Sequence, residues 1–275
     1  MDFKAYLENE NLSDKTITNH LRNIEKSIHF FGHDFPSQYS DEDLVNDIKH
    51  NELNLSQSLT LSNTLSKYYK YLELPNDHLV NYIAFINNEL KKKYINRNKE
   101  LVYPYTKKDL ISQMNNFYEN DKWKKYIISY LLINLNVRNE DLNIEVVRHK
   151  KFISKTKNVL IIRRSDILYI RYNYKTKDRY GTKENQIKSK KFYISVLNFF
   201  QQRQYDDRCP ADLFYKFYNS TNQIKKHTPY QLKESDIIKI ILNESSSSLH
   251  KASKISIRRG TDLKTLESNY NINKK

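Results

Sequence analysis

Cysteine and glycine are both scarce in this chain, and their scarcity excludes two kinds of site. Cys209 is the only cysteine among 275 residues. A single thiol cannot form an internal disulfide or a structural zinc site, so we expect a protein of a reducing compartment. The three glycines, Gly32, Gly181 and Gly260, do not have the spacing of a phosphate-binding loop of the G-x-x-x-x-G-K type. The sequence therefore argues against an enzyme driven by ATP or GTP.

Long apolar segments are lacking as well. The first ten residues are polar and charged, and they contain no apolar segment of the kind found in signal peptides. No apolar run approaches the roughly 18 residues that a membrane-spanning helix requires. We therefore expect an intracellular protein without a membrane anchor.

Positive charge and aromatic side chains are abundant. The chain has 47 Lys and Arg against 32 Asp and Glu, a formal net charge of +15, together with 22 Tyr and 12 Phe. A disordered chain would not carry so many aromatic residues, so we expect at least one packed core. The positive charge attracts polyanions, of which nucleic acid is the first candidate and an anionic membrane surface the second. A basic protein without such a partner is the alternative.

The first third of the chain has the apolar spacing of helices. Ser13 is a plausible N-cap, and Ile17, Leu21, Ile24 and Ile28 then fall on one helical face. These apolar stripes predict a core and carry no chemistry. We expect helices around Phe3–Leu7, after Ser13, after Ser40 or Asp41, over Leu59–Leu72 and, for a short one, over Leu79–Leu90.

A basic, polar stretch follows at residues 91–100, KKKYINRNKE, without an apolar period. It is the best candidate for a linker, and the solvated end of a helix is the alternative. Between two DNA-binding lobes, Lys91, Lys92, Lys93 and Arg97 would lie along phosphates and gain from the release of counterions. We therefore divide the chain into a helical domain at 1–95, a linker at 96–105 and a second domain at 106–275.

The second domain mixes helices and strands. Thr106 is expected to cap one helix, and a strongly apolar helix should span Trp123–Leu135. Residues 158–163 and 166–172 are β-branched, aromatic and alternating, which predicts strands. The expected fold class is mainly α with a small antiparallel β-sheet (α+β). Residues from Lys191 begin a further strand or helix, and more helices are expected over Ser195–Gln202, Ala211–Tyr218 and Glu234–Leu242.

Three segments together resemble one family. The first consists of YL at residues 6–7, SDKTI at 13–17 and HFFG at 29–32. It is similar to the core-binding domain of tyrosine recombinases, the phage integrase family, and that domain clamps one face of a DNA duplex. The resemblance is to members from large DNA viruses and their virophages. It implies double-stranded DNA as the partner, and it places the protein in the nucleus, the viral factory of an infected cell or the cytoplasm.

The second segment, residues 126–142, reads YIISYLLINLNVRNEDL. It resembles the family's first box, in which an apolar helix ends at a tight turn that presents an arginine, followed by an acidic residue. The matching residues are Arg138 and Asp141. The resemblance gives Arg138 a catalytic role, and its planar guanidinium is suited to binding two phosphate oxygens. The alternative is an ordinary surface arginine after a core helix.

The third segment, residues 172–183, reads YNYKTKDRYGTK. It resembles the β-hairpin that carries the family's catalytic lysine, and Lys175 is the match. The implied role of Lys175 is to protonate the departing 5′ oxygen. Lys177, Arg179 and Lys183 are expected to contact DNA. The alternative is a basic hairpin that only touches phosphate.

The family's second box is H-x-x-R, and its closest match is ISIRR at residues 255–259. Ile255 stands at the position of the histidine. Arg258 is our choice for the second catalytic arginine. Arg259 is the alternative for that role and is otherwise expected to contact DNA.

The nucleophilic tyrosine of the family follows this arginine at a longer spacing than the chain provides. Seventeen residues follow Arg258, and Tyr270 is the only tyrosine among them. Tyr270 is therefore our candidate, as the nucleophile of a contracted end. The alternatives are a chain without a nucleophile, or a tyrosine that is supplied by further sequence or by a neighbouring subunit.

The resemblance implies a site-specific recombinase or integrase that forms a 3′-phosphotyrosyl DNA intermediate without metal or cofactor. Recombination of two duplexes would involve a homotetramer on DNA. A relaxing topoisomerase would use the same chemistry as a monomer. The rival from another class is a DNA-binding protein that derives from a recombinase and has lost cleavage. A third possibility, RNA binding through exposed tyrosines, has only the composition in its favour.

Overall fold

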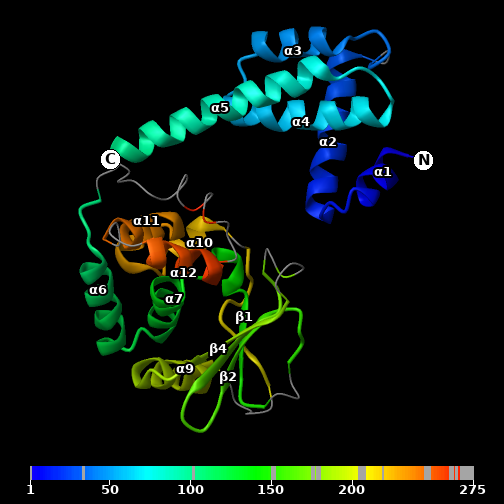
Figure 1. Cartoon of the computed structure of the whole chain (residues 1–275). Helices are drawn as coiled ribbons and strands as arrows, with labels where there is room; N and C mark the ends of the chain where they lie inside the picture. The colour runs from blue at the N-terminus through cyan, green and yellow to red at the C-terminus, as the bar shows by residue number, and fades with distance from the viewer. Residues whose placement is uncertain are drawn as a thin grey trace. The chain divides into compact units, whose positions relative to one another are not determined.

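The computed structural model describes most of the chain and divides it into two compact units, Met1–Arg97 and Asn98–Lys275 (Figure 1). Each unit has its own hydrophobic core. The described residues are 2–32, 35–100, 103–149, 153–174, 177, 181–203, 209–218, 220–244, 249–259, 263 and 266.

The described part of the first unit is helical. Its core contains Leu7, Leu44, Leu65 and Leu79, which are fully buried. Its helices are α1 (Phe3–Asn9), α2 (Asp14–Phe31), α3 (Asp41–His50), α4 (Leu55–Tyr71) and α5 (Asp77–Glu100).

Short polar residues cap α1, α2, α3 and α4, and the sequence predicted two of these caps. The Asp2 side chain accepts the Ala5 N–H at the start of α1. Ser13 caps α2, and Ser40 caps α3 in a reciprocal pair of hydrogen bonds with Asp43. Asn54 forms the same kind of pair with Gln57. Because this pair satisfies the free N–H groups of the first turn, α4 begins one turn before the predicted Leu59.

The last helix of this unit is longer than predicted. Residues 91–100 belong to α5, so the basic stretch is the end of a helix and not an irregular linker. No glycine or proline interrupts the chain from Asp77 to Glu100, and Lys, Asn and Leu extend the helix at modest energetic cost. The unit boundary at Arg97 therefore falls within α5.

The second unit combines helices with a five-stranded sheet, as the α+β class predicts. Thr106 caps α6 in a hydrogen-bonded pair with Asp109, as expected. The helices of this unit are α6 (Lys107–Glu119), α7 (Trp123–Asn134), α9 (Lys190–Arg203), α10 (Thr221–Lys225), α11 (Glu234–Glu244) and α12 (Leu249–Arg259), with short 3₁₀ turns η1 (Asn139–Leu142) and η3 (Pro229–Gln231).

The sheet is mixed and not purely antiparallel, which corrects one part of the expectation. Its order is β4-β3-β2-β1-β5. β1 and β2 run parallel, with Ile144 opposite Asn158, because the chain returns to the same end of the sheet between them. The other three pairs are antiparallel. The strands are β1 (Ile144–Val147), β2 (Asn158–Ile162), β3 (Ile167–Arg171), β4 (Lys183–Ile187) and β5 (Ala211–Asp212).

Residues 211–218 do not form the helix that the sequence suggested. Ala211 pairs with Val146 in the sheet, and the Leu213 N–H donates to the Ile144 carbonyl at 2.9 Å. Leu213 is fully buried, whereas Tyr215 is 87% exposed. Pairing with β1 therefore overrides the local helical preference of this segment.

Helix α7 is the centre of the second unit. It packs on α6, α9 and α11, and α9 covers β1 and β2 (Figure 1). Val159, Ile161 and Leu168 form a smaller cluster apart from this main core. The residues of β2 and β3 are buried in these two clusters, and this explains why these strands consist mainly of consecutive apolar residues. The C-terminal end of α7 leads directly into the segment that carries Arg138.

Candidate functional site

Arg138 follows helix α7 after a tight turn. The helix ends at Leu135, and Asn136 then adopts a left-handed backbone with φ of 53°. Asparagine tolerates this conformation better than most residues. The Val137 N–H returns to the Leu131 carbonyl at 3.4 Å. A buried helix and its closing turn thus fix the start of the segment that presents Arg138.

The acidic residue three positions later holds the backbone of Arg138. The Asp141 carboxylate accepts the Arg138 N–H at 3.0 Å, and the Arg138 carbonyl accepts the Asp141 N–H at 3.0 Å. The Arg138 side chain is 15% exposed, and its Nη1 lies 3.4 Å from a carboxylate oxygen of Glu140. The backbone is therefore fixed while the guanidinium keeps partial access to solvent.

Asp141 also forms a buried ion pair with Arg171 at the end of β3. The Arg171 Nη1 lies 3.2 Å from the Asp141 carboxylate, and the two side chains are 3% and 1% exposed. Burial raises the pKa of the Asp141 carboxyl, and the Arg171 guanidinium opposes this rise. Tyr169 and Asn158 each donate to the Asp141 carbonyl at 2.9 Å. The sheet thus anchors the Arg138 segment.

Helix α12 brings two arginines to the same segment in different environments. The Arg259 side chain is 2% exposed and is paired with Glu234. Its Nη1 also donates to the carbonyls of Asn136 and Val137, at 3.4 and 3.5 Å. The Arg258 side chain is exposed, and its Nη1 donates to the Asn134 carbonyl at 2.9 Å.

Glu234 connects these two parts of the site. One carboxylate oxygen pairs with Arg259, and the other accepts the Asn139 N–H at 2.7 Å. A single buried carboxylate therefore fixes helix α12 against the turn that presents Arg138.

Two cations meet the C-terminal end of α12. The Lys183 Nζ donates to the Ile257 carbonyl at 2.9 Å, and the Arg171 Nη1 donates to the Arg258 carbonyl at 3.1 Å. The last carbonyls of a helix have no partner within the helix and carry a partial negative charge. Lys183 and Arg171 satisfy two of them and fix α12 against β3 and β4.

Arg138 and Arg171 are both close enough to Lys183 to influence its charge, and we call these three residues the cation site. The pKa of Lys183 is lowered by burial and by the charges of Arg171 and Arg138, while Asp141 acts in the opposite direction. Such a concentration of positive charge favours the binding of an anion. A phosphate beside the Arg138 guanidinium would be attracted by several positive charges at once.

Of the residues predicted for the site, the structure brings together Arg138, Lys183, Arg258 and Arg259. Lys177 is exposed, and Lys91, Lys92 and Lys93 are exposed on α5 of the other unit; Arg97 belongs to the same helix. Arg259, which we expected to contact DNA, is buried and paired with Glu234. Lys175, Arg179 and Tyr270 lie outside the described residues.

Sequence reasoning gave no role to Arg171 and Glu234. Arg171 ends a strand that is otherwise apolar, and a charge at the end of a buried strand is the signal that indicates a paired cation. Glu234 opens a helix, where acidic residues are common for local reasons, so no sequence signal distinguishes it.

Metal-ligand clusters and membrane-spanning helices are both absent from the described part of the chain. Among the described residues, no group of three His, Cys, Asp or Glu side chains is arranged to hold a metal ion. None of the described helices is long and apolar enough to cross a membrane.

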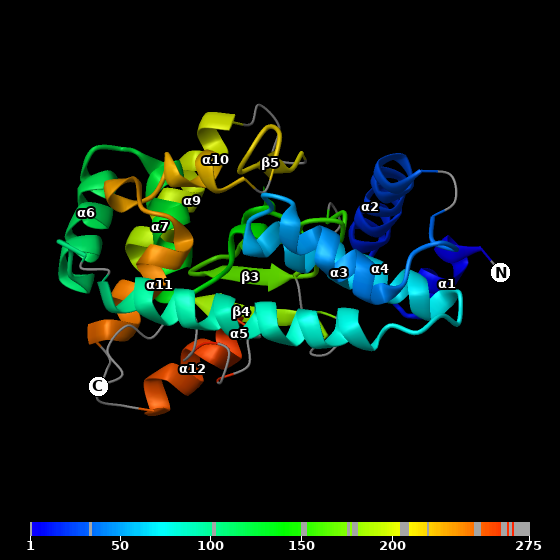
Figure 2. The ribbon, with the colours of Figure 1, turned by 90° about the horizontal axis from the view of Figure 1, so that it is seen from above.

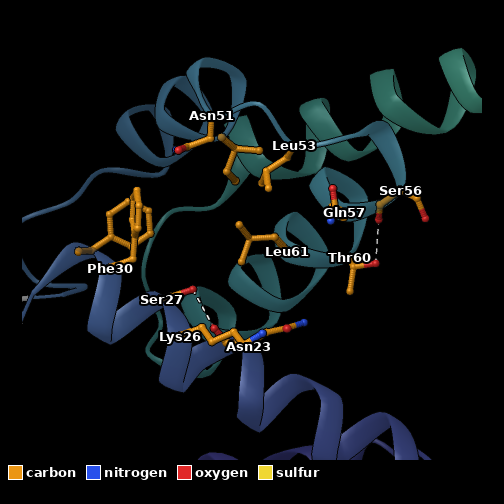
Figure 3. A pocket seen from close by; sticks show the side chains of 12 residues that line it. Asn23, Lys26, Ser27, Phe30, Asn51, Leu53, Ser56, Gln57, Thr60 and Leu61 are labelled. Carbon is orange, nitrogen blue, oxygen red and sulfur yellow. Dashed lines mark hydrogen bonds between the residues drawn. The ribbon is translucent and has the colours of Figure 1, made fainter.

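A pocket of about 430 Å³ lies in the helical unit, between α2 and the turn from α3 to α4 (Figure 3). Phe30, Leu53 and Leu61 line it together with the amides of Asn23 and Gln57. Phe30 is 64% exposed. These residues belong to a different unit from the cation site.

Comparison with known proteins gives little beyond this geometry. No family model and no curated protein sequence matches the chain. Among solved structures, a crystal structure of XerA recombinase is similar with a TM-score of 0.34 and 14% sequence identity, over 99% of this chain and 93% of that chain. The argument for function therefore rests on the residues of the site.

Proposed function

We propose that this chain is a DNA-binding recombinase whose phosphate site is built around Arg138. The observation that supports this most strongly is the convergence of Arg138, Arg171 and Lys183 at the end of α12. A turn after a buried helix and two neighbouring strands, β3 and β4, each contribute one cation to this place. Such preorganised cations are suited to a phosphate that gains negative charge during a reaction.

The distribution of charge supports the second unit as the main DNA contact. Residues 1–97 hold 11 Lys and Arg against 14 Asp and Glu, a formal net charge of −3. The remaining residues hold 36 against 18, a net charge of +18. Contacts to phosphates supply most non-specific affinity for DNA. The helical unit then contributes mainly through the basic end of α5, with Lys91, Lys92 and Lys93.

The two arginines of α12 take different roles in this proposal. Arg258 is exposed and binds the scissile phosphate together with Arg138, each guanidinium reaching the nonbridging oxygens. Arg259 is buried against Glu234, so it fixes α12 and does not reach DNA. In this proposal Arg258 is the second catalytic arginine and Arg259 has a structural role; the sequence had left the two residues as alternatives.

Cleavage would proceed by exchange of one phosphoester for another. A tyrosine oxygen, for which Tyr270 is the candidate, attacks phosphorus and forms a bond to it. The bond from phosphorus to the 5′ oxygen breaks, and Lys175 protonates that oxygen. The 3′-phosphotyrosyl link conserves the ester for rejoining, and the step needs no metal ion or cofactor. Recombination of two duplexes would use four protomers.

The second candidate is a DNA-binding protein that has lost cleavage. Ile255, which is 5% exposed, occupies the position where the resemblance predicts histidine, and this favours the second candidate. A nicked duplex that traps cleaved strands separates the two. A covalent protein–DNA adduct, resistant to denaturation, supports the recombinase; tight duplex binding without an adduct supports the second candidate.

A further inference from the structure

A second concentration of positive charge lies at the other end of α7. Lys122 is the N-cap residue of this helix, and Lys124 and Lys125 lie in its first turn. Arg203 ends α9, and Lys226 follows α10. We call these five residues the α7–α9 surface. None of them belongs to the cation site.

Arg203 lies near Lys124, and Lys124, Lys125 and Lys226 lie near His227. Burial and the charge of Arg203 lower the pKa of Lys124 to about 8. Burial also lowers the pKa of His227 to about 4, and Lys124, Lys125 and Lys226 act in the same direction. Charges influence one another mainly at short range. The start of α7 and the residue after α10 therefore place like charges near one imidazole, and the Phe214 ring, 5.6 Å from the His227 ring, lies under Lys124.

Aromatic rings lie beside two of these cations. The Lys124 Nζ lies 3.9 Å from the centre of the Phe214 ring, and the Lys125 Nζ lies 5.6 Å from that of Phe117. In the described part of the chain, none of the five cations forms an ion pair. The charge of the α7–α9 surface is therefore available to an anionic partner.

The neighbouring side chains fit a nucleic-acid backbone. An open depression of about 480 Å³ is lined by Trp123 and by the amides of Asn198, Gln201 and Gln202, with Asp121 as an acidic member. Lys122 and Arg203 adjoin this lining in sequence. Lys, Arg, Asn and Gln are the side chains that proteins use to contact phosphate and sugar groups.

The α7–α9 surface is separate from the cation site. Arg138 follows the C-terminal end of α7, whereas Lys122 precedes its N-terminal end. A helix of 12 residues is about 18 Å long, at a rise of about 1.5 Å per residue. Figures 1 and 2 both place α9 and α12 on opposite sides of α7.

We propose that the α7–α9 surface binds the phosphate backbone of a second DNA segment while the cation site holds the first. This inference rests on the proposed DNA binding but not on cleavage. One chain would then contact two duplexes, and an exchange of strands requires two duplexes to be held in one assembly.

A capture experiment tests this inference. One duplex is immobilised, the full chain is added, and retention of a second, fluorescent duplex is measured at about 100 mM salt. The test variant combines Lys122→Gln, Arg203→Gln and Lys226→Gln, because all three side chains are exposed and their loss should not disturb folding. The control variant combines Lys108→Gln, Arg164→Gln and Lys188→Gln, three exposed cations of the same unit outside both clusters.

We expect the test variant to capture the second duplex at least about 10-fold less well, while its affinity for a single duplex changes less than about 3-fold. The control variant should behave as the wild type, and sedimentation should show the same oligomeric state for all three. Unchanged capture by the test variant would overturn the inference and point to an acidic protein as the partner of this surface. Equal losses of capture and of single-duplex affinity would also overturn the inference, because the α7–α9 surface would then belong to the interface with the first duplex.

The same experiment distinguishes a failure of the proposed function from a failure of this inference. A wild-type chain that binds no duplex at all refutes both proposals. A wild-type chain that binds one duplex but never captures a second refutes only the inference.

Discussion

The buried pair of Arg259 and Glu234 gives the most informative stability prediction. The two side chains are 2% and 13% exposed, and Glu234 also accepts the Asn139 N–H. Arg259→Met removes one partner and leaves the carboxylate largely desolvated. Breaking a buried pair in this way costs about 3–5 kcal/mol. For a unit of this size, we expect a loss of roughly 6–20 °C in Tm.

Neighbouring variants isolate the cause of this loss. Arg258→Met removes the adjacent exposed guanidinium and one hydrogen bond, so it should cost about 1 kcal/mol or less. Glu234→Gln combined with Arg259→Met should recover part of the loss, because no buried charge then remains unpaired. Urea unfolding followed by circular dichroism measures all four proteins. A cost below about 1 kcal/mol for Arg259→Met, or an equal cost for Arg258→Met, would refute the division of roles between the two arginines.

Two further predictions concern salt and pH. Duplex DNA affinity should fall steeply between about 50 and 200 mM salt, because several phosphate contacts release counterions; an unchanged Kd in a fluorescence titration would exclude a phosphate-dominated mode. Burial lowers the pKa of His227 to about 4 from 6.5, so the unfolded chain binds the proton first as the pH falls. The free energy of unfolding should therefore fall by about 1–2 kcal/mol as the pH decreases from 6.5 toward 4. The partial exposure of the ring keeps this loss small. His227→Gln, measured by urea unfolding across this range, should show a smaller loss, and an equal loss would assign the effect to other groups.

Local signals in the sequence predicted much of the fold. The caps at Ser13, Ser40 and Thr106 begin helices as expected, and the apolar run from Trp123 forms α7. The errors concern segments whose structure depends on distant partners. The pairing of β5 with β1 determines the conformation of residues 211–212, and the parallel pair of β1 and β2 cannot be read from alternation alone.

The candidate site was predictable only in part, for a similar reason. The pattern of an apolar helix, a turn and an arginine indicated Arg138, and the structure confirms its place at the end of α7. Arg171 and Glu234 act through contacts across 30 and 25 residues of sequence, with Asp141 and Arg259. The sequence left Arg258 and Arg259 as alternatives, and only burial distinguishes the exposed guanidinium from the buried one.

Strand cleavage by the wild type, Arg138→Lys and Arg164→Lys on one nicked suicide duplex tests the central claim most directly. If Arg138 holds the scissile phosphate, its planar fork matters more than its charge. The account predicts a covalent adduct with the wild type, at least about 100-fold less adduct with Arg138→Lys at nearly unchanged DNA affinity, and full activity with the exposed control Arg164→Lys. Tight binding without any adduct, or equal effects of the two substitutions, would contradict it.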